Sequence, residues 1–410
     1  MDENMSEMLK RDLLRIIENE QIPDPLIAIK PVTIKGDNNI GIMLGIEVTS
    51  ETSDKSLHLV CKSEPKSAVI LQEFRINVMF DTERFFYTHL FPLFDKFQDK
   101  MGISDEDRFK HYPVCYGFTE AALFMKDMRR EGFKMMDKSQ PIGYEHAKLA
   151  MESLGKFHAM GLVLKDQHPT DFKVINDHLP PDLYGKPVHK PTYDFFKGTM
   201  KFARETLEDD EEDLKKKVDY IIENLQTVML EAVDEDLAEP YTTYSHGDFW
   251  NNNVLYRHDE AGKPVEAYLL DFQLSHYRSP CVDIYEYLFS SFDQVFREKY
   301  YDQLLKDYHK SACTLMSKLG TDPDRVFPFS ALEAQKKRGG MYGVVFASIL
   351  LKVILGEGAE VYDSEKIAES IKNNDFSSAE DKLIVDENVY KLYKKRMSDV
   401  IRHADKLGII

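Results

Sequence analysis

The chain has 410 residues, which is enough for two lobes around a sizeable core. Its 71 acidic and 53 basic residues give a formal net charge of −18, which argues against nucleic acid or an anionic membrane as a partner. The four cysteines are widely spaced and form no CxxC pair, so we expect neither a zinc site nor a disulfide framework. Scattered free thiols suit a reducing compartment.

Targeting and membrane segments are not predicted. Residues 1–20 are acidic and amphipathic and lack the basic start and apolar core of a signal peptide. The most apolar run, residues 342–355, is too short to span a bilayer and contains Lys352. We therefore expect a soluble, cytoplasmic protein that does not bind membranes; the sequence does not indicate an oligomeric state.

The N-terminal part is predicted to be a helix followed by a small sheet. Apolar residues at helical spacing predict a helix over residues 6–19, and residues 31–49 predict a hairpin with its turn at residues 35–39. In that turn Gly36, Asn38 and Asn39 can present backbone N–H groups to phosphates, so we expect them to bind a nucleotide. The turn is not a full G-x-G-x-x-G, and an ordinary hairpin turn is the competing interpretation.

A third strand is predicted over residues 57–62, and it ends at Lys62. A lysine in this place can neutralise the α and β phosphates of a nucleotide, and a helical glutamate can hold its ammonium group. Glu73 and Glu83 compete for that role. We favour Glu83 because it lies mid-helix among apolar neighbours, whereas a solvated strand end is the alternative for Lys62.

Two more strands, over residues 114–118 and 121–125, complete the predicted sheet. The junction that follows, with Met125 and Asp127, is where the edge of an adenine would bind, although any core strand has the same apolar pattern. The chain then becomes helical. We therefore divide it into a nucleotide-binding lobe, residues 1–127, and a catalytic and acceptor-binding lobe, residues 128–410.

A long helix is predicted over residues 141–163, and it carries His158. His158 could be catalytic, but we favour a packed and hydrogen-bonded histidine. Further along the chain, Asp283 could cap a helix that begins there and could also bond back to the preceding segment. We interpret Asp283 as a structural support.

Residues 244–255 and 269–273 carry the chemistry. An apolar strand end leads to a tight turn with Asp248, Asn253 follows five residues later, and a second short strand ends in Asp271. Asp-x₄-Asn with a later Asp at a strand end has the spacing of a kinase catalytic loop and its metal-binding aspartate. Asp248 would be the base that orients the attacking hydroxyl, and Asn253 and Asp271 would hold Mg²⁺ on the triphosphate of ATP. Taken singly, each fragment could be an ordinary turn or strand end.

The acceptor is predicted to be a small molecule. Only eleven residues lie between Asp271 and Asp283, and no Ala-Pro-Glu follows, so there is too little chain for the segment on which a protein kinase lays a peptide. Gly247 stands where protein kinases have an arginine, and Gln273 stands where their Asp-Phe-Gly has glycine.

The motifs at residues 246–255 and 270–273, together with residues 80–92 and 304–308, resemble the insect ecdysteroid kinase-like family, relatives of choline kinases and aminoglycoside phosphotransferases. The resemblance covers nearly the whole chain. It implies an α+β, two-lobed protein-kinase-like fold with a small β-rich N-lobe and a large, mainly helical C-lobe. It also implies ATP and Mg²⁺ as cofactors and transfer of the γ-phosphate to a hydroxyl group. Asn39, Gly41 and Met128 depart from the usual residues of the family, which puts the detail of the phosphate loop in doubt.

Three functions stay open at this point. The first is a kinase for an ecdysteroid or a similar hydroxylated lipophilic compound, acting in hormone metabolism or detoxification, which the resemblance and the aromatic residues of the segment 172–202 favour. The second is a kinase for a cationic acceptor such as choline or an aminoglycoside, which would require carboxylates or an aromatic cage. The third is a non-catalytic small-molecule-binding protein on a kinase fold.

Overall fold

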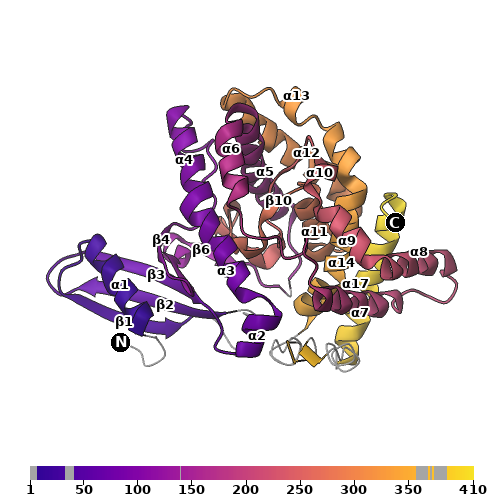
Figure 1. Cartoon of the computed structure of the whole chain (residues 1–410), viewed down its shortest axis with the longest axis horizontal. Coiled ribbons are helices and arrows are strands. Elements are labelled where there is room, and N and C mark those ends of the chain that lie inside the picture. The colour runs from indigo at the N-terminus through magenta and orange to yellow at the C-terminus, as the bar shows by residue number, and fades with distance from the viewer. Residues whose placement is uncertain (1–6, 33–40, 139, 357–367, 370–371, 374–385) are drawn as a thin grey trace.

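The computed structural model describes residues 7–32, 41–138, 140–356, 368–369, 372–373 and 386–410. A β-sheet part formed by the N-terminal segment lies on one side of the molecule, and a larger, mainly helical part lies on the other (Figure 1). This is the two-part α+β architecture that the sequence predicts. The expected lobe boundary at residue 127 falls directly after the last strand of the first sheet, and the division into two domains stays a prediction.

The first part is built on a five-stranded sheet in the order β1-β2-β3-β5-β4, in which all neighbours are antiparallel. The strands alternate between buried and accessible positions most clearly in β2, because one face of the sheet is covered and the other is not. Their bounds are β1 Pro25–Pro31, β2 Ile42–Ser50, β3 Ser56–Ser63, β4 Cys115–Phe118 and β5 Ala122–Lys126.

The first strand lies earlier than the sequence predicts. We expected it after Pro31, but β1 runs from Pro25 to Pro31, and the turn at residues 35–39 lies outside the described residues. Proline lacks a backbone N–H, so it normally interrupts a strand within a sheet. Because β1 is an edge strand, it tolerates a proline at each end. The other predicted strands of this sheet are confirmed.

Helix α1, Glu7–Asn19, covers one face of the sheet (Figure 1). Its apolar stripe, Leu9, Leu13, Ile16 and Ile17, is buried together with side chains of β2, β3 and β5 in a separate small core. The strongly amphipathic pattern over residues 6–19 is therefore satisfied within this part, and the predicted helix is confirmed.

A run of helices then connects the sheet to the larger part. It comprises α2 Ala68–Glu73, α3 Ile76–Phe85, the π-helix η1 Phe86–Leu90 and α4 Phe91–Lys100. The rings of Phe86 and Phe91 contact the ring of Phe272 at centroid distances of 6.0 and 4.9 Å, so these helices belong to the large core and not to the sheet core. Phe272 follows the predicted metal ligand Asp271 directly, so this packing fixes α3 against the catalytic segment.

The larger part contains short strands that carry the catalytic segments. A three-stranded sheet has the order β6-β8-β9, and a two-stranded ladder joins β7 to β10. Their bounds are β6 Phe133–Met135, β7 Thr243–Ser245, β8 Val254–His258, β9 Pro264–Leu269 and β10 His276–Arg278, with 3₁₀ turns η2 Met128–Glu131, η3 Asn251–Asn253 and η4 Phe272–Leu274.

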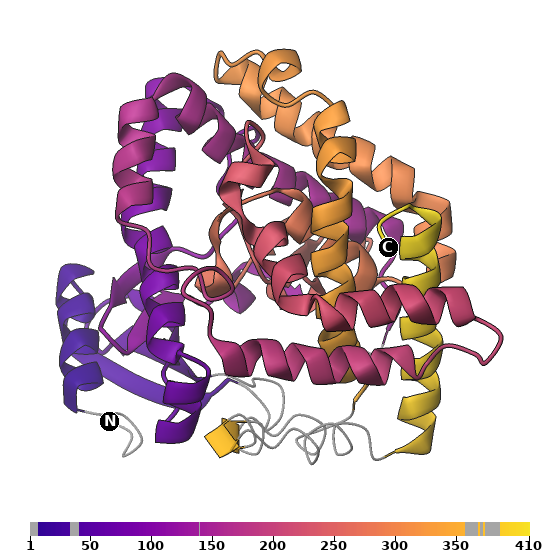
Figure 2. The same cartoon turned by 45° about the vertical axis from the view of Figure 1, so that its right-hand side comes forward.

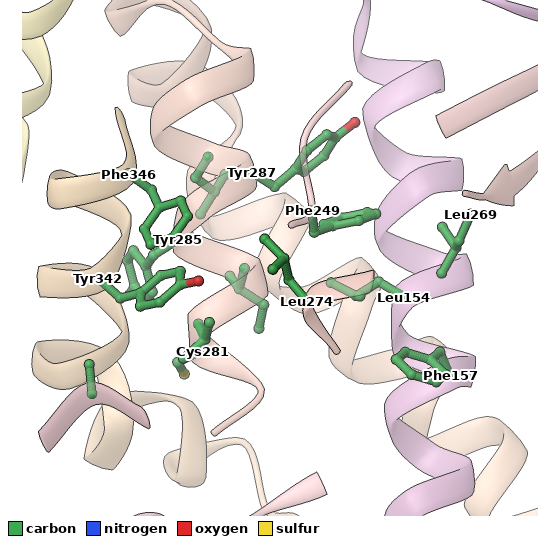
Figure 3. Close-up of a cluster of buried hydrophobic side chains, with 14 of the residues drawn as sticks. Leu154, Phe157, Phe249, Leu269, Leu274, Cys281, Tyr285, Tyr287, Tyr342 and Phe346 are labelled. Carbon is green, nitrogen blue, oxygen red and sulfur yellow. The ribbon is translucent and has the colours of Figure 1, made fainter. Parts of the chain in front are cut away.

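Helices surround these strands (Figure 2). In chain order they are α5 Tyr144–Gln167, α6 Pro169–Asp177, α7 Lys190–Arg204, α8 Glu212–Glu223, α9 Leu225–Val233, α10 Glu235–Ala238, α11 Cys281–Ser291, α12 Gln294–Lys318, α13 Pro323–Val326, α14 Ser330–Leu355 and α17 Glu387–Lys406. Among the described helices only α14 is long and apolar enough to cross a membrane, and it is mostly buried in the core. Figure 3 shows side chains of α5 and α14 on either side of the two segments that bear Phe249 and Leu274.

Candidate active site

The turn that carries Asp248 requires a glycine at position 247. Strand β7 leads into this turn, and Gly247 has a φ of +81°. A Cβ at position 247 would lie 2.0 Å from the carbonyl oxygen of Leu274, so any side chain would displace the backbone on both sides. The close approach of residues 247 and 274 therefore holds the two catalytic segments together.

Asp283 supports the same turn through hydrogen bonds to its backbone. Its Oδ2 accepts hydrogen bonds from the backbone N–H of His246 at 2.6 Å and from His158 Nε2 at 2.8 Å, and its Oδ1 accepts from the N–H of Gly247 at 2.7 Å. Burial raises the pKa of Asp283, but the hydrogen bonds from His158 and the other donors outweigh burial. The pKa of Asp283 therefore lies below its usual value. The predicted bond back to the catalytic turn is thus confirmed.

Asp283 does not cap its helix, because α11 begins at Cys281 with Pro280 at the cap position. Its side chain is instead aimed at the turn, where each carboxylate oxygen accepts from one backbone N–H. His158 is fully buried and hydrogen-bonded to Asp283 and to the Tyr308 hydroxyl, which confirms the packed histidine that we favoured.

Asp248 and Asn253 lie within hydrogen-bonding distance. Asn253 Nδ2 donates to Asp248 Oδ2 at 2.9 Å and to the Asp248 carbonyl at 2.8 Å, which closes the loop between β7 and β8. Burial, and then the charge of Asp271, raise the pKa of Asp248 to about 7, against the opposing bond from Asn253. A carboxyl group with a pKa near neutrality suits a group that receives a proton.

The segment bearing Asp271 lies beside this loop. His246 Nε2 bonds to the Leu270 carbonyl at 2.8 Å, and the Leu270 N–H donates to the Asn253 carbonyl at 2.9 Å. Asp271 itself has a φ of +67°, a conformation that costs free energy for any residue other than glycine. This strained backbone, with the two hydrogen bonds beside it, brings Asp271 and Asn253 to one side of the site.

Lys62 joins the two parts of the molecule. Its Nζ lies 2.6 Å from Glu83 Oε2, 2.6 Å from Asp271 Oδ1 and 3.3 Å from Gln273 Oε1. Burial lowers the pKa of Lys62, but the two carboxylates outweigh burial and raise it above its usual value, so the ammonium stays charged. The pairing of Lys62 with Glu83, which we favoured over Glu73, is confirmed. Glu83 also accepts from the backbone N–H of Phe272 at 3.3 Å.

Two of the remaining residues predicted to bind a nucleotide, Met125 and Asp127, have other partners. Gly36, Asn38 and Asn39 lie outside the described residues. Met125 pairs with Val60 in the neighbouring strand. The Asp127 carboxylate is bonded to Arg129 at 2.8 and 2.7 Å, and the backbone N–H of Asp127 donates to His58, so adenine contacts at this junction stay a prediction.

A groove of about 740 Å³ does not coincide with the site. Its lining includes Phe91, Tyr112, Met128 and Tyr268. Asp248 and Asp271 are not among the residues that line it. Its charged rim is largely paired internally, for example Arg108 with Asp99 at 2.8 Å. The candidate catalytic residues are therefore identified by their side-chain chemistry and mutual contacts, and not by their lining this groove.

The residues present fit Mg²⁺ and a nucleoside triphosphate. Asp271 offers a carboxylate, and the amide nitrogen of Asn253 is engaged with Asp248, which leaves its side-chain oxygen as a ligand. Lys62 supplies a buried cation of the kind that phosphates attract. The described residues contain no group of three or more His, Cys, Asp or Glu side chains that could hold a metal ion.

Several polar residues near Asp248 were not predicted from the sequence. Glu286 Oε2 accepts from the backbone N–H of Phe249 at 3.0 Å, and burial together with the Asp248 charge raises the pKa of Glu286 well above its usual value. Its spacing of three residues from Asp283 on one helix face was the available signal. Arg278 and Asp182 form a buried ion pair beside the turn, and nothing local in the sequence marks their partnership.

Comparisons with known proteins place the chain in a family. The model of the ecdysteroid kinase-like family matches residues 35–321, and a search of curated proteins finds no significant match. Among solved structures, the choline kinase from Cryptosporidium parvum is 13% identical, with 90% of this chain and 93% of that chain covered and a TM-score of 0.43. The Plasmodium vivax ethanolamine kinase is 13% identical, with coverages of 87% and 83% and a TM-score of 0.40.

A third structure, the GDP complex of wild-type aminoglycoside 2'-phosphotransferase-IIIa, is 9% identical, with 97% of this chain and 99% of that chain covered and a TM-score of 0.40. The family model, in contrast, extends over well over half of the 410 residues and includes Lys62, Glu83, Asp248, Asn253 and Asp271. The chain therefore belongs to the ecdysteroid kinase-like family.

Proposed function

We propose that the protein is an ATP- and Mg²⁺-dependent phosphotransferase that acts on a hydroxyl group of a small lipophilic compound, an ecdysteroid or a similar hydroxylated molecule. The proposal rests on two contacts in one site: Asn253 donates to Asp248 at 2.9 Å, and Lys62 pairs with Asp271 at 2.6 Å. Phosphoryl transfer requires one carboxylate for the acceptor hydroxyl, oxygen ligands for the metal and a cation for the phosphates.

Each residue then has a defined task. Asp248 accepts or orients the proton of the acceptor hydroxyl, and its pKa of about 7 keeps it largely ionised in mildly alkaline solution. Asp271 and Asn253 would hold Mg²⁺, which neutralises charge on the triphosphate. Lys62 would contact the phosphates while Glu83 fixes its position. Catalysis would rest on positioning and charge neutralisation, because the transition state is loose.

The acceptor class is supported by the surroundings of Asp248. Tyr184, Phe196, Tyr342 and Phe346 form a ring cluster, with Tyr184 and Phe346 centroids 5.4 Å apart and Tyr342 stacked on Phe346 at 4.2 Å. The Tyr342 hydroxyl donates to the Gly247 carbonyl at 3.1 Å, so this cluster adjoins the catalytic turn. Aromatic side chains with a few polar groups nearby suit a flat, hydroxylated, apolar compound.

The test is incubation of the purified chain with Mg²⁺, ATP and a panel of acceptors, followed by mass spectrometry of the products. The panel contains ecdysteroids, other hydroxylated lipophilic compounds, choline and an aminoglycoside, with Asp248→Asn as the control. A phosphorylated ecdysteroid that is absent with the variant supports the proposal. Choline phosphate alone would keep the chemistry and overturn the acceptor class, and nucleotide binding without any product would favour a binding protein.

The site of action is also a proposal. The four cysteines are free thiols, as expected for a protein of the reducing cytoplasm. Phosphorylation adds charge to a lipophilic compound and keeps it in water, which is useful both for storing a hormone in inactive form and for detoxification. Fractionation of the native protein, with the phosphorylated product assayed in each fraction, distinguishes the compartments.

A further inference from the structure

Arg278, in strand β10, is enclosed by an acid and an aromatic ring. Its side chain is 1% exposed, and its Nε and Nη2 donate to the Asp182 carboxylate at 2.8 and 2.5 Å. The guanidinium carbon lies 5.8 Å from the ring centroid of Tyr184. A cation held between a carboxylate and a ring face is a stable arrangement, since both partners favour positive charge.

This buried ion pair lies next to the catalytic turn. Strand β10 pairs with β7, the strand that leads to Asp248, and Arg278 stands opposite Thr243. Arg278 Nη1 is 3.3 Å from the point that a Cβ of residue 247 would occupy. Tyr184 is close enough to Asp248 for the charge of that carboxylate to raise the pKa of its phenol, after burial. The guanidinium thus adjoins the place where an acceptor must meet Asp248.

Without its guanidinium, this place would be a cation site. Asp182 would present a carboxylate, and Tyr184 and Tyr342, whose centroids are 6.3 Å apart, would present aromatic faces. A carboxylate beside aromatic rings is the arrangement that recognises ammonium groups. The position that such a ligand would take is filled by Arg278.

Arg278 Nη1 and Glu286 Oε1 lack a hydrogen-bond partner among the described residues, and both atoms are shielded from solvent. Arg278 and Glu286 are themselves at most 1% exposed, so these atoms cannot turn to water without a local opening. An unpaired buried polar atom destabilises the folded protein, and a ligand that supplies the missing hydrogen-bond partner would recover that loss.

We propose that Arg278 determines acceptor specificity: as a built-in cation it excludes ammonium compounds, and its free Nη1–H donates to an oxygen atom of a neutral acceptor beside the hydroxyl group that is phosphorylated. This inference rests on the proposed function, because it takes the surroundings of Asp248 as the acceptor site. It selects the neutral, oxygen-rich class over the cationic class for this chain.

The first experiment measures the binding of cations by thermal shift and calorimetry. Guanidinium, methylguanidinium and tetramethylammonium ions should bind Arg278→Ala saturably and at least tenfold more tightly than they bind the wild-type protein, because the carboxylate of Asp182 loses the guanidinium that neutralises it. The gain should vanish in Asp182→Asn/Arg278→Ala. A folded Arg278→Ala with no gain in cation binding would overturn the proposal.

Arg257→Ala is the matched control. Arg257 also pairs with a carboxylate, Glu266 at 2.6 Å, and lies 5.7 Å from a ring, Phe133, but its side chain is 45% exposed. We expect Arg257→Ala to leave acceptor choice unchanged. An equal change in acceptor choice in the two variants would overturn a specific role for Arg278.

The wild-type protein provides a measurement that does not depend on the folding of Arg278→Ala. Choline and tetramethylammonium should not compete with a neutral acceptor, and competitive inhibition by either ion would overturn the proposal. Arg278→Lys keeps the positive charge and should continue to exclude these ions, whereas Arg278→Ala should shift the ratio of kcat/KM toward choline at least tenfold. Absence of any kinase activity in the wild type would overturn the proposed function, and the cation-binding comparison would still decide whether Arg278 fills a cation site.

Discussion

The Asp283 carboxylate accepts a hydrogen bond from the backbone N–H of Gly247 at 2.7 Å, and this bond attaches the catalytic turn to helix α11. The same carboxylate binds His246 N–H and His158, so one buried acid organises three donors. The position of Asp248 therefore depends on a residue that does not touch the reacting groups.

Asp283→Asn should reduce both stability and turnover. An amide keeps one acceptor oxygen but turns an NH₂ group toward backbone donors, so at least one buried N–H loses its partner. We expect a loss of about 2–4 kcal/mol in the free energy of unfolding, measured by urea denaturation. Asp213→Asn, at an exposed position of α8, is the control and should change stability little. A stable Asp283→Asn variant with normal kcat would show that the turn keeps its conformation without the Asp283 carboxylate.

Asp248→Asn tests the base. The substitution keeps the size of the side chain but removes the proton acceptor, so kcat should fall roughly 10²–10⁴-fold while Mg²⁺·ATP still binds. Nucleotide binding is measured by calorimetry and turnover by phosphate transfer to the acceptor. Turnover at the wild-type rate would remove Asp248 from the role of base.

Asp271→Asn tests the metal ligand. Loss of the carboxylate should weaken the binding of Mg²⁺·ATP at least tenfold, with a smaller effect on the binding of ATP measured in EDTA. The comparison of the two titrations isolates the metal-dependent part. An equal change in ATP affinity with and without Mg²⁺ would mean that Asp271 acts only by positioning Lys62.

Lys62 and Glu83 should behave as a coupled pair. Lys62→Met leaves Glu83, which is fully buried, without its cation, so the variant should lose stability and at least tenfold in kcat/KM for ATP. Glu83→Gln in the same chain should recover part of the lost stability, because it removes the stranded charge. A double-mutant cycle should give a coupling free energy of about 1–3 kcal/mol. Additive effects would mean that the pair contributes nothing as a pair.

Stability should fall in mildly acidic solution because of His403. Burial and the neighbouring Arg297, whose Nε donates to His403 Nδ1 at 3.0 Å, lower the pKa of His403 to about 4. The unfolded chain takes up a proton near pH 6.5, so the stability that is present above that pH is lost as the pH falls from 6.5 toward 4, by about 1.4 kcal/mol per unit.

His403→Asn should remove this part of the pH dependence. The free energy of unfolding of the wild type and the variant is measured between pH 8 and pH 5, and the value at pH 8 gives the pH-independent cost of the substitution. The two curves should converge as the pH falls. Parallel curves would show that His403 does not contribute to acid sensitivity.

The sequence by itself determined the candidate catalytic set. Asp248, Asn253 and Asp271 lie in short, ordered motifs whose spacing follows from local geometry, because Asp248 and Asp271 follow the strands β7 and β9 and Asn253 directly precedes β8. Lys62 could likewise be placed at the end of β3 from its alternation pattern. Local backbone geometry is written in neighbouring residues, and such features are therefore predictable from them.

Only the tertiary structure decided the partners. Glu83 and Glu73 are both helical acids, and packing of the Phe86 and Phe91 rings on Phe272 brings Glu83 to Lys62. The first strand was expected from Pro31 onward, but β1 ends at Pro31, and its edge position tolerates a proline at each end. Arg278 and Asp182, which are far apart in the chain, meet only because β10 pairs with β7 and the segment after α6 folds over it. Such long-range contacts depend on how the whole core packs, and the residues next to each partner in the chain carry no record of it.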